Sequence, residues 1–221
     1  MIEITRQLPI KLEGTIFDVE TTGLSPRTGE LITVGYISGS ELHVFQRMPN
    51  ETEKEFREKL GDLSSLPRPF LAYNKKFEER WLGFEIDEDI MESWRRLAEE
   101  RRKDGFKVHY NLEELVPTLT GVRFGVEFTS KDVISAWEMA SNALKKIMSS
   151  SEEKEVNLAF TFLGLGLRLI IAHNIDDLLR ALHLHLLNTA WEYIFEPEGL
   201  DRDLDNIIHN IIRLLTTQGA E

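Results

Sequence analysis

Apolar and polar residues alternate with the two-residue period of β-strands in the first half of the chain. Residues with β-branched and aromatic side chains gather in short runs separated by glycine, proline and serine, which is typical of strands joined by turns. Five such runs predict strands, at residues 14–20, 30–38, 40–48, 67–74 and 85–91. The first three runs follow one another without an intervening helix, so a meander is predicted there.

Apolar residues recur every three or four positions in the remaining segments, which is the period of an amphipathic α-helix. Helices are predicted at residues 51–63, 75–84, 111–122, 130–150, 152–187 and 200–217. The first should end near Gly61, and Thr129 or Ser130 is expected to cap the fourth. No linker is long enough to divide the chain. Residues 1–221 are therefore predicted to form a single α/β domain, with a helical C-terminal extension over about 188–221.

The composition limits the chemistry of any active site. The chain has no cysteine, so a disulfide, a thiolate zinc site and a cysteine nucleophile are excluded. Carboxylates and histidines remain as metal ligands, and oxygen ligands favour hard cations. A formal net charge of -12 argues against broad adhesion to nucleic acid but leaves room for a local site. Many charged residues and no cysteine are typical of a thermophile protein.

No segment of the sequence predicts a membrane span or an export signal. Uninterrupted apolar runs stay below the roughly 18 residues that a membrane-spanning helix needs. The N-terminal "MIEITRQLPI" lacks the basic-then-apolar order of a signal peptide. A cytoplasmic protein without a membrane partner is expected. The apolar helices after residue 152 exceed what one small sheet can cover, which favours a homo-oligomer.

The stretch "TIFDVETTGL" at residues 15–24 places two carboxylates at the end of a predicted strand. Asp18 and Glu20 are two residues apart, so an extended backbone directs both side chains to one face. Adjacent carboxylates repel each other, and a bound cation removes that repulsion. A metal site is predicted here. The competing interpretation is a solvated pair of acids at a strand end.

Two further pairs of polar residues have the spacing of four that puts side chains on one face of a helix. Asn74 and Glu78 form the first pair, where a predicted strand gives way to a helix. His173 and Asp177 form the second pair, beside an apolar stripe suited to packing on the sheet. Either pair is compatible with a site at the sheet edge. The alternatives are an exposed helix charge for the first and a helical hydrogen-bonded pair for the second.

Three segments together resemble a known family. "FDVETTGL", "AYNKKFEERWL" and "HNIDDLLRAL" occur in the order and spacing of the three exonuclease motifs of the DEDD superfamily. The nearest subgroup is that of the ribonuclease H-like domains of the YprB type, whose third motif also reads "HN..D". The resemblance spans residues 15–182. It implies a ribonuclease H-like fold, with a mixed five-stranded sheet flanked by helices and a helical C-terminal half.

The resemblance implies a 3′-to-5′ exonuclease that uses two Mg²⁺ or Mn²⁺ ions and acts on the 3′ ends of single-stranded DNA or RNA. Carried over motif by motif, it assigns the metal ligands to Asp18, Glu20, Glu78 and Asp177. It gives His173 the role of assisting the attacking water. An imidazole, with an unperturbed pKa of about 6.5, suits a general base near neutral pH. These five residues are the candidate catalytic residues.

Two positions depart from the family pattern. The second motif ordinarily has aspartate after its aromatic residue, whereas this chain has Glu78 after Phe77. The third motif ordinarily has tyrosine four residues before its aspartate, or histidine five before it, and this chain has histidine at four. Two neighbouring acids are weaker candidates. Glu79 lies off the Asn74 face of its helix, and Asp176 would give a spacing that fits neither pattern.

The same resemblance implies that residues beside the first two motifs hold the 3′-terminal nucleotide, namely Thr21, Thr22, Leu24 and Asn74. Lys75, Lys76 and Arg80 either meet phosphates or form a solvated helix face. Two alternative functions remain for the chain as a whole. One is a structure-specific endonuclease on the same fold. The other is a non-catalytic ribonuclease H-like module that binds nucleic acid or protein, against which the intact set of acids argues.

Two other features are interpreted as structural. His183 and His185 are two residues apart on a predicted helix, so they face different directions and make a poor metal pair. The glycine-rich "LGLGLR" at residues 163–168 follows no strand. It is therefore expected to let helices approach closely and not to bind phosphate.

Overall fold

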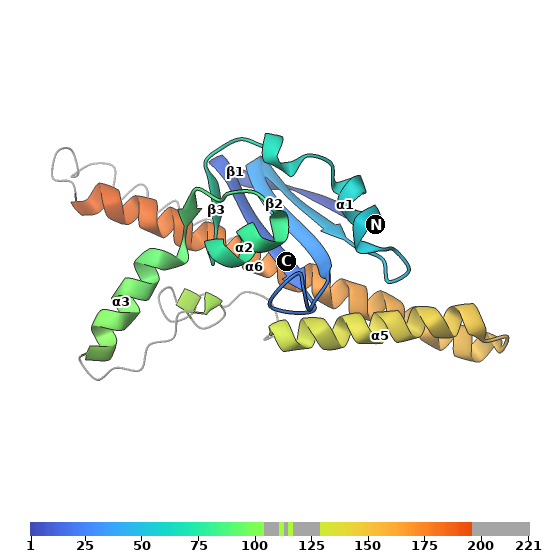
Figure 1. Ribbon diagram of the computed structural model, residues 1–221. Coiled ribbons are helices and arrows are strands. Elements are labelled where there is room, and N and C mark those ends of the chain that lie inside the picture. Colours follow the sequence, from blue (N-terminus) through green and yellow to red (C-terminus); the bar gives the residue numbers. More distant parts are fainter. Residues whose placement is uncertain (104–110, 113–114, 117–128, 196–221) are drawn as a thin grey trace.

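The computed structural model describes residues 1–103, 111–112, 115–116 and 129–195 (Figure 1). Most of the predicted helix over 111–122 and all of the one over 200–217 lie outside these ranges. The described part is a mixed α/β structure with a helical C-terminal half, as the sequence predicts.

One sheet organises the N-terminal half. Its strands are β1 (Ile2–Thr21), β2 (Leu31–Gln46), β3 (Phe70–Ala72) and β4 (Glu88–Asp89). Their order across the sheet is β2-β1-β3-β4. β1 and β2 are antiparallel, whereas β3 runs parallel to both of its neighbours. The predicted mixed sheet is confirmed. β1 is a central strand, so the end of β1 is flanked by other elements on both sides.

The number of strands differs from the prediction. The predicted strands 30–38 and 40–48 belong to one continuous strand, β2. Residues 2–7 are also part of β1 and pair with residues 41–46, so the ladder continues past the predicted turn. Gly39, with a φ of 59°, lies next to a shift in register and does not end the strand. Among the described residues the sheet has four strands, where the sequence predicted five.

Helices and one 3₁₀ turn make up the rest of the regular structure among the described residues. They are α1 (Glu53–Leu60), η1 (Leu63–Ser65), α2 (Lys75–Leu82), α3 (Met91–Lys103), α5 (Ser130–Ser149) and α6 (Glu153–Phe195). Thr52 and Glu55 form a reciprocal capping box at the start of α1, and Gly61 ends that helix with a positive φ. Thr129 takes the capping position of α5, and its amide and hydroxyl both donate to Asp132.

The long helix α6 carries His173 and Asp177 and packs against the sheet. It runs beneath the sheet as one continuous helix, and α5 packs along its first half (Figure 1). Ile16 and Ile37 of the sheet share a core cluster with Leu178 and Leu182 of α6. Ile32 of β2 joins a second cluster with α5 and the first half of α6. Apolar contacts at several levels therefore fix the rotation of α6 about its own axis.

Gly166 lets α5 and α6 approach closely, as expected for the glycine-rich segment. A Cβ added to Gly166 would lie 2.6 Å from the carbonyl oxygen of Ala136. We expect Gly166→Ala to lower the free energy of unfolding by about 1–3 kcal/mol, because backbone must move to accept it. At Gly164 an added Cβ meets nothing within 4 Å, so Gly164→Ala should be neutral or stabilising by up to about 1 kcal/mol. Urea unfolding distinguishes the two variants, and equal effects would contradict this packing.

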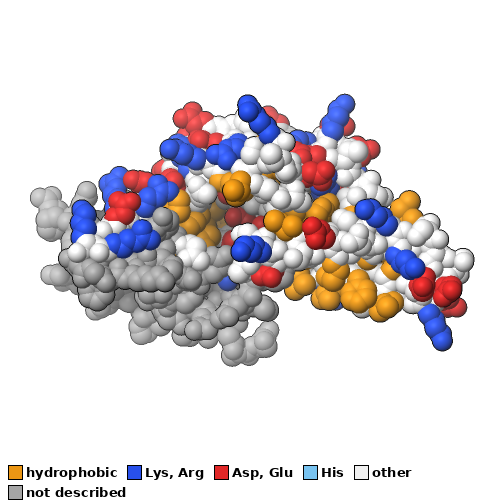
Figure 2. Space-filling view, turned by 60° about the horizontal axis from the view of Figure 1, so that its bottom comes forward, with side chains coloured by type: hydrophobic (Ala, Val, Ile, Leu, Met, Phe, Trp, Pro, Cys, Tyr) orange, Lys and Arg blue, Asp and Glu red, His pale blue; other side chains and the backbone are white. Residues whose placement is uncertain are grey.

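Apolar side chains are exposed along the α5–α6 hairpin (Figure 2). They are Met148, Leu158, Phe160, Phe162 and Leu165. The segment Glu153–Thr189 of α6 is also long and apolar enough to cross a membrane, by length and composition only, and 44% of its most apolar window is buried. Core helices of globular proteins pass the same test. A second copy of the chain could cover the exposed residues, and the predicted homo-oligomer stays a prediction.

Candidate active site

A cavity of about 470 Å³ lies at the C-terminal end of β1. Its walls come from β1 and the loop after it, the segment before α2, the first turns of α2, α3 and α5, residues 111–112 and the middle of α6. All five predicted catalytic residues line it: Asp18, Glu20, Glu78, His173 and Asp177. Three segments that are distant in the sequence thus bring four carboxylates and one imidazole into one cavity.

β1 directs two of these carboxylates into the cavity. Asp18 pairs across the ladder with Gly35, and Glu20 pairs with Thr33. Val19 lies between the two acids and packs into a core cluster, because successive side chains on a strand point to opposite faces. Glu20 is only 7% exposed. Its carboxylate is therefore held largely out of water and has to be balanced by neighbouring groups.

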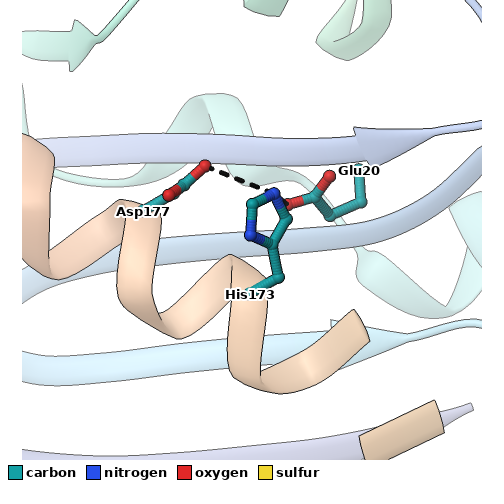
Figure 3. A group of neighbouring side chains, drawn as sticks. All are labelled: Glu20, His173 and Asp177. Carbon is teal, nitrogen blue, oxygen red and sulfur yellow. Dashed lines mark ion pairs between the residues drawn. The ribbon is translucent and has the colours of Figure 1, made fainter. Parts of the chain in front are cut away.

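The imidazole of His173 points between two carboxylates (Figure 3). Its Nε2 atom lies 3.7 Å from Glu20 Oε1 and 3.6 Å from Asp177 Oδ2. Both distances are longer than a hydrogen bond but lie within the range of an ion pair with a protonated imidazole. His173, Asp177 and Glu20 each offer one ligand atom, and the three atoms lie within 4.8 Å of one another. A single cation could contact all three at ordinary ligand distances.

Glu78 is the most deeply buried of the acids in the cavity. It comes from the first turn of α2, and its carboxylate accepts a hydrogen bond from the backbone of Val19. Its Oε2 atom is buried without a hydrogen-bond partner among the described residues. Burial raises the pKa of the Glu78 carboxyl well above 4.5, and the negative charges of Asp18 and Asp177 raise it further. Without a cation, therefore, this site disfavours a charged Glu78.

The raised pKa of Glu78 predicts how stability depends on pH in the metal-free protein. The folded state favours the protonated carboxyl, so this stabilisation is complete below the unfolded value of 4.5 and is lost as pH rises through the higher folded value. In EDTA at pH about 8, Glu78→Gln should therefore be more stable than the wild type, and a gain of about 1 kcal/mol would raise Tm by ~2–4 °C. The difference should disappear near pH 4.5.

The control for this comparison is Glu85→Gln, which removes an equal charge from an exposed position. Thermal melting by circular dichroism across the pH range measures all three proteins. A Glu78→Gln protein that melts below the wild type at high pH in EDTA would show that the buried carboxylate is well compensated.

The neighbouring acid Glu79 has other contacts. Its Oε1 atom accepts a hydrogen bond from the amide of Ile86 and lies 3.6 Å from Lys75 Nζ. Glu79 is also absent from the described residues that line the cavity. Of the two adjacent acids, Glu78 is thus the one that shares a cavity with Asp18.

Asp177 has a different neighbour on each side of its carboxylate. Arg180, three residues further along α6, donates from Nη1 to Oδ1, while Oδ2 faces His173. Arg180 is almost fully buried, so this ion pair restricts how the carboxylate can turn. Asp176 is not among the described residues that line the cavity. Burial raises the pKa of the Asp176 carboxyl, with Arg180 and His173 opposing the shift.

The residues expected to hold the terminal nucleotide are only partly at the cavity. Thr21, Leu24 and Asn74 line it, and the Leu24 side chain is 80% exposed. Thr22 does not belong to the described lining. Its hydroxyl accepts a hydrogen bond from the amide of Glu30, which closes the loop between β1 and β2. Thr22 thus has a structural contact in this loop, and its contact with the terminal nucleotide stays a prediction.

The basic residues of α2 differ in their contacts. Arg80 donates from Nη1 to the carbonyl oxygen of Leu24 at 2.7 Å, so it braces the loop at the cavity mouth. Lys75 contacts Glu79 on the same helix. Lys76 is exposed. Of the three, Arg80 therefore has a defined structural contact at the cavity mouth.

Asn174 and Arg180 belong to the surroundings of the site, although no role was predicted for either. Asn174 donates from Nδ2 to Asp18 Oδ2 at 2.6 Å. Two features of the sequence point to these residues. Asn174 directly follows His173 in "HNIDD", and Arg180 has the spacing of three from Asp177 that allows an ion pair on one helix face.

The donor set fits hard or borderline divalent cations. Carboxylate oxygens suit Mg²⁺ and Mn²⁺, and one imidazole is compatible with Mn²⁺. The unpartnered Oε2 of Glu78 is the observation that favours a cation most directly, because a buried carboxylate oxygen is costly unless a donor or a metal satisfies it. The gathering of four acidic side chains in one cavity also favours a bound cation, because ionised carboxylates repel one another.

Comparison with known proteins gives only distant similarities. No protein-family profile and no curated protein matches the chain. Among solved structures, the chain is similar to Brucella melitensis NrnC, with 14% identity over 94% of this chain and 85% of that chain and a TM-score of 0.40. It is also similar to Brucella melitensis NrnC bound to pGG (13% identity, 86% and 91% covered, TM-score 0.36) and to an apo form of a nuclease (14%, 86% and 88%, TM-score 0.37). Likeness at this level does not show a family for this chain.

Proposed function

We propose that this protein is a divalent-metal-dependent nuclease that hydrolyses phosphodiester bonds at the 3′ ends of single-stranded DNA or RNA. The observation that carries the proposal is the convergence of four carboxylates, from β1, α2 and α6, on one cavity that also contains a histidine. Such a cluster is unfavourable as a purely structural feature, because like charges repel and a buried carboxylate lacks solvation. It is favourable once divalent cations are bound.

Bound cations also explain how an acidic protein can accept a polyanion. The formal net charge is -12, so the cavity without cations repels phosphate. Asp18, Glu20, Glu78 and Asp177 are proposed to hold two Mg²⁺ or Mn²⁺ ions, which would reverse the local charge and supply positive charge to the phosphate and to the attacking water.

His173 is proposed to act as the general base. Its Nε2 atom faces the cavity between Glu20 and Asp177. A proton taken from the attacking water would pass to Nε2, which lies beside these two carboxylates.

The end of a single strand is the proposed substrate, because the carboxylates lie in a recess. Leu24 is exposed at this cavity, where an apolar side chain can contact a base, and Arg80 braces its backbone. Thr21 and Asn74 also line the cavity and are proposed to contact the terminal nucleotide. A cytoplasmic location, one domain over residues 1–221 and a thermophilic source stay predictions.

Labelled oligonucleotides test the proposal. Single strands of DNA and RNA, labelled at the 5′ end, are incubated with the protein in Mg²⁺, Mn²⁺ or EDTA, with the 3′ end free or chemically blocked. We expect products that shorten stepwise from the 3′ end, only with metal, and much more slowly when that end is blocked. Internal cuts that ignore the block would favour the endonuclease. Binding without any cleavage would favour the non-catalytic module.

A further inference from the structure

We infer that Asn174 is a positioning residue for Asp18, and that Gly35 is glycine because any side chain there would displace Asn174. The inference rests on the proposed function only in taking Asp18 as a metal ligand. Asn174 itself has no role in the proposed chemistry and is not among the described residues that line the cavity.

The contact between Asn174 and Asp18 is short, and its Asn174 side is fully buried. Asn174 has 0% exposed surface, and its Nδ2 atom donates to Asp18 Oδ2 at 2.6 Å and to the Asp18 carbonyl oxygen at 3.3 Å. A hydrogen bond to an ionised carboxylate is stronger than one between neutral groups. Because one amide group contacts both the side chain and the backbone of Asp18, it restricts rotation of the carboxylate relative to β1.

Gly35 provides the space for this amide. It lies directly opposite Asp18 in the β1–β2 ladder, so a side chain at position 35 would share the face of Asp18. A Cβ there would lie 2.0 Å from Asn174 Oδ1 and 2.7 Å from Leu178 Cδ1. Gly35 is not among the described glycines with a positive φ, so backbone conformation does not require it. Close approach of α6 is the remaining reason for glycine inside this strand.

Two consecutive residues of α6 contact the two acids of β1. His173 faces Glu20, and the next residue, Asn174, faces Asp18. The Asn174 amide holds the side chain and the backbone of Asp18 at the same time. Asn174 therefore keeps Asp18 aimed into the cavity before any cation arrives.

Binding of Mn²⁺ to the full-length protein without substrate tests the inference. Free Mn²⁺ is measured by electron paramagnetic resonance, and folding is followed by thermal melting. Loss of a residue that orients a metal ligand typically weakens metal binding about 10–100-fold, and we expect that range for Asn174→Ala. Gly35→Ala should weaken binding similarly although Asn174 is retained. The matched control is Asn157→Ala, an exposed asparagine on the same helix, which should leave affinity unchanged.

The double variant Gly35→Ala/Asn174→Ala separates positioning from general damage. If both residues act through one contact, its Mn²⁺ affinity should be no lower than that of Asn174→Ala. Additive losses, or wild-type affinity in folded Asn174→Ala, would overturn the inference. A wild type that binds Mn²⁺ but cleaves no strand would instead overturn the proposed nuclease activity. The Mn²⁺ affinities of the variants would still test the role of Asn174. A wild type that binds no Mn²⁺ would contradict both.

Discussion

Asp18→Asn is expected to lower the cleavage rate by ~10³-fold or more under single-turnover conditions. The substitution keeps the shape of the side chain but removes a negative oxygen from the proposed metal ligands. A bound cation contributes several kcal/mol of charge stabilisation in hydrolytic sites, and each 1.4 kcal/mol corresponds to about tenfold in rate. The variant should also stay folded, because removing one carboxylate relieves its repulsion of Glu78.

Glu13→Gln is the matched control for Asp18→Asn. Glu13 lies on the same strand but is exposed, and it is not among the described residues that line the cavity. The control should cleave at the wild-type rate. Full activity in a well-purified Asp18→Asn protein would show that Asp18 is not a catalytic metal ligand. It would also contradict a catalytic role for the acid cluster.

His173→Ala is expected to lower the rate by roughly 10²–10⁴-fold, the usual contribution of a general base. His173→Gln should be slowed similarly and should differ from the wild type in the pH dependence of the rate, because an amide cannot accept the proton of the attacking water. Single-turnover rates from about pH 5 to 9 measure both effects. Metal affinity serves as a second readout.

If His173 only orients the attacking water, His173→Gln or His173→Tyr would keep most of the activity and the wild-type pH profile. His43→Gln is the control, because His43 pairs with Thr5 and Glu41 and is absent from the described lining of the cavity. An unaltered profile in His173→Gln would end the general-base assignment.

The pattern of apolar and polar residues predicted the types of the secondary-structure elements better than it predicted their lengths. The period-two run at the end of β1 and the spacing-four pairs on α2 and α6 placed Asp18, Glu78 and Asp177 on the correct elements, and the resemblance of the three motifs assigned them to one site. The length of β1 and β2 was not predictable in the same way. Gly39 and Ser40 have the composition of a turn, and only pairing between residues 2–7 and 41–46 makes them part of one strand.

In the candidate site, too, some residues could be predicted from the sequence and others could not. Asp18, Glu20 and His173 were recognisable because their residue types and spacing have direct chemical meaning. Asn174 was visible only as the neighbour of His173 in "HNIDD", and its role was not recognisable because it depends on a contact with a residue 156 positions earlier in the chain. The role of Gly35 could not be predicted from the sequence either. The reason for a glycine there becomes clear only from the structure, in which α6 passes close to that point of the sheet.

The most direct test of the central claim measures cleavage and metal occupancy in the same sample. Metal-free protein is titrated with Mn²⁺ while bound ion and shortening of a 5′-labelled single strand are recorded together. If the four carboxylates form the catalytic metal site, cleavage should be absent in EDTA and should rise with Mn²⁺ occupancy, and Asp18→Asn should reduce both. Cleavage that persists in EDTA, or that is unrelated to occupancy of a site containing Asp18, would contradict the account.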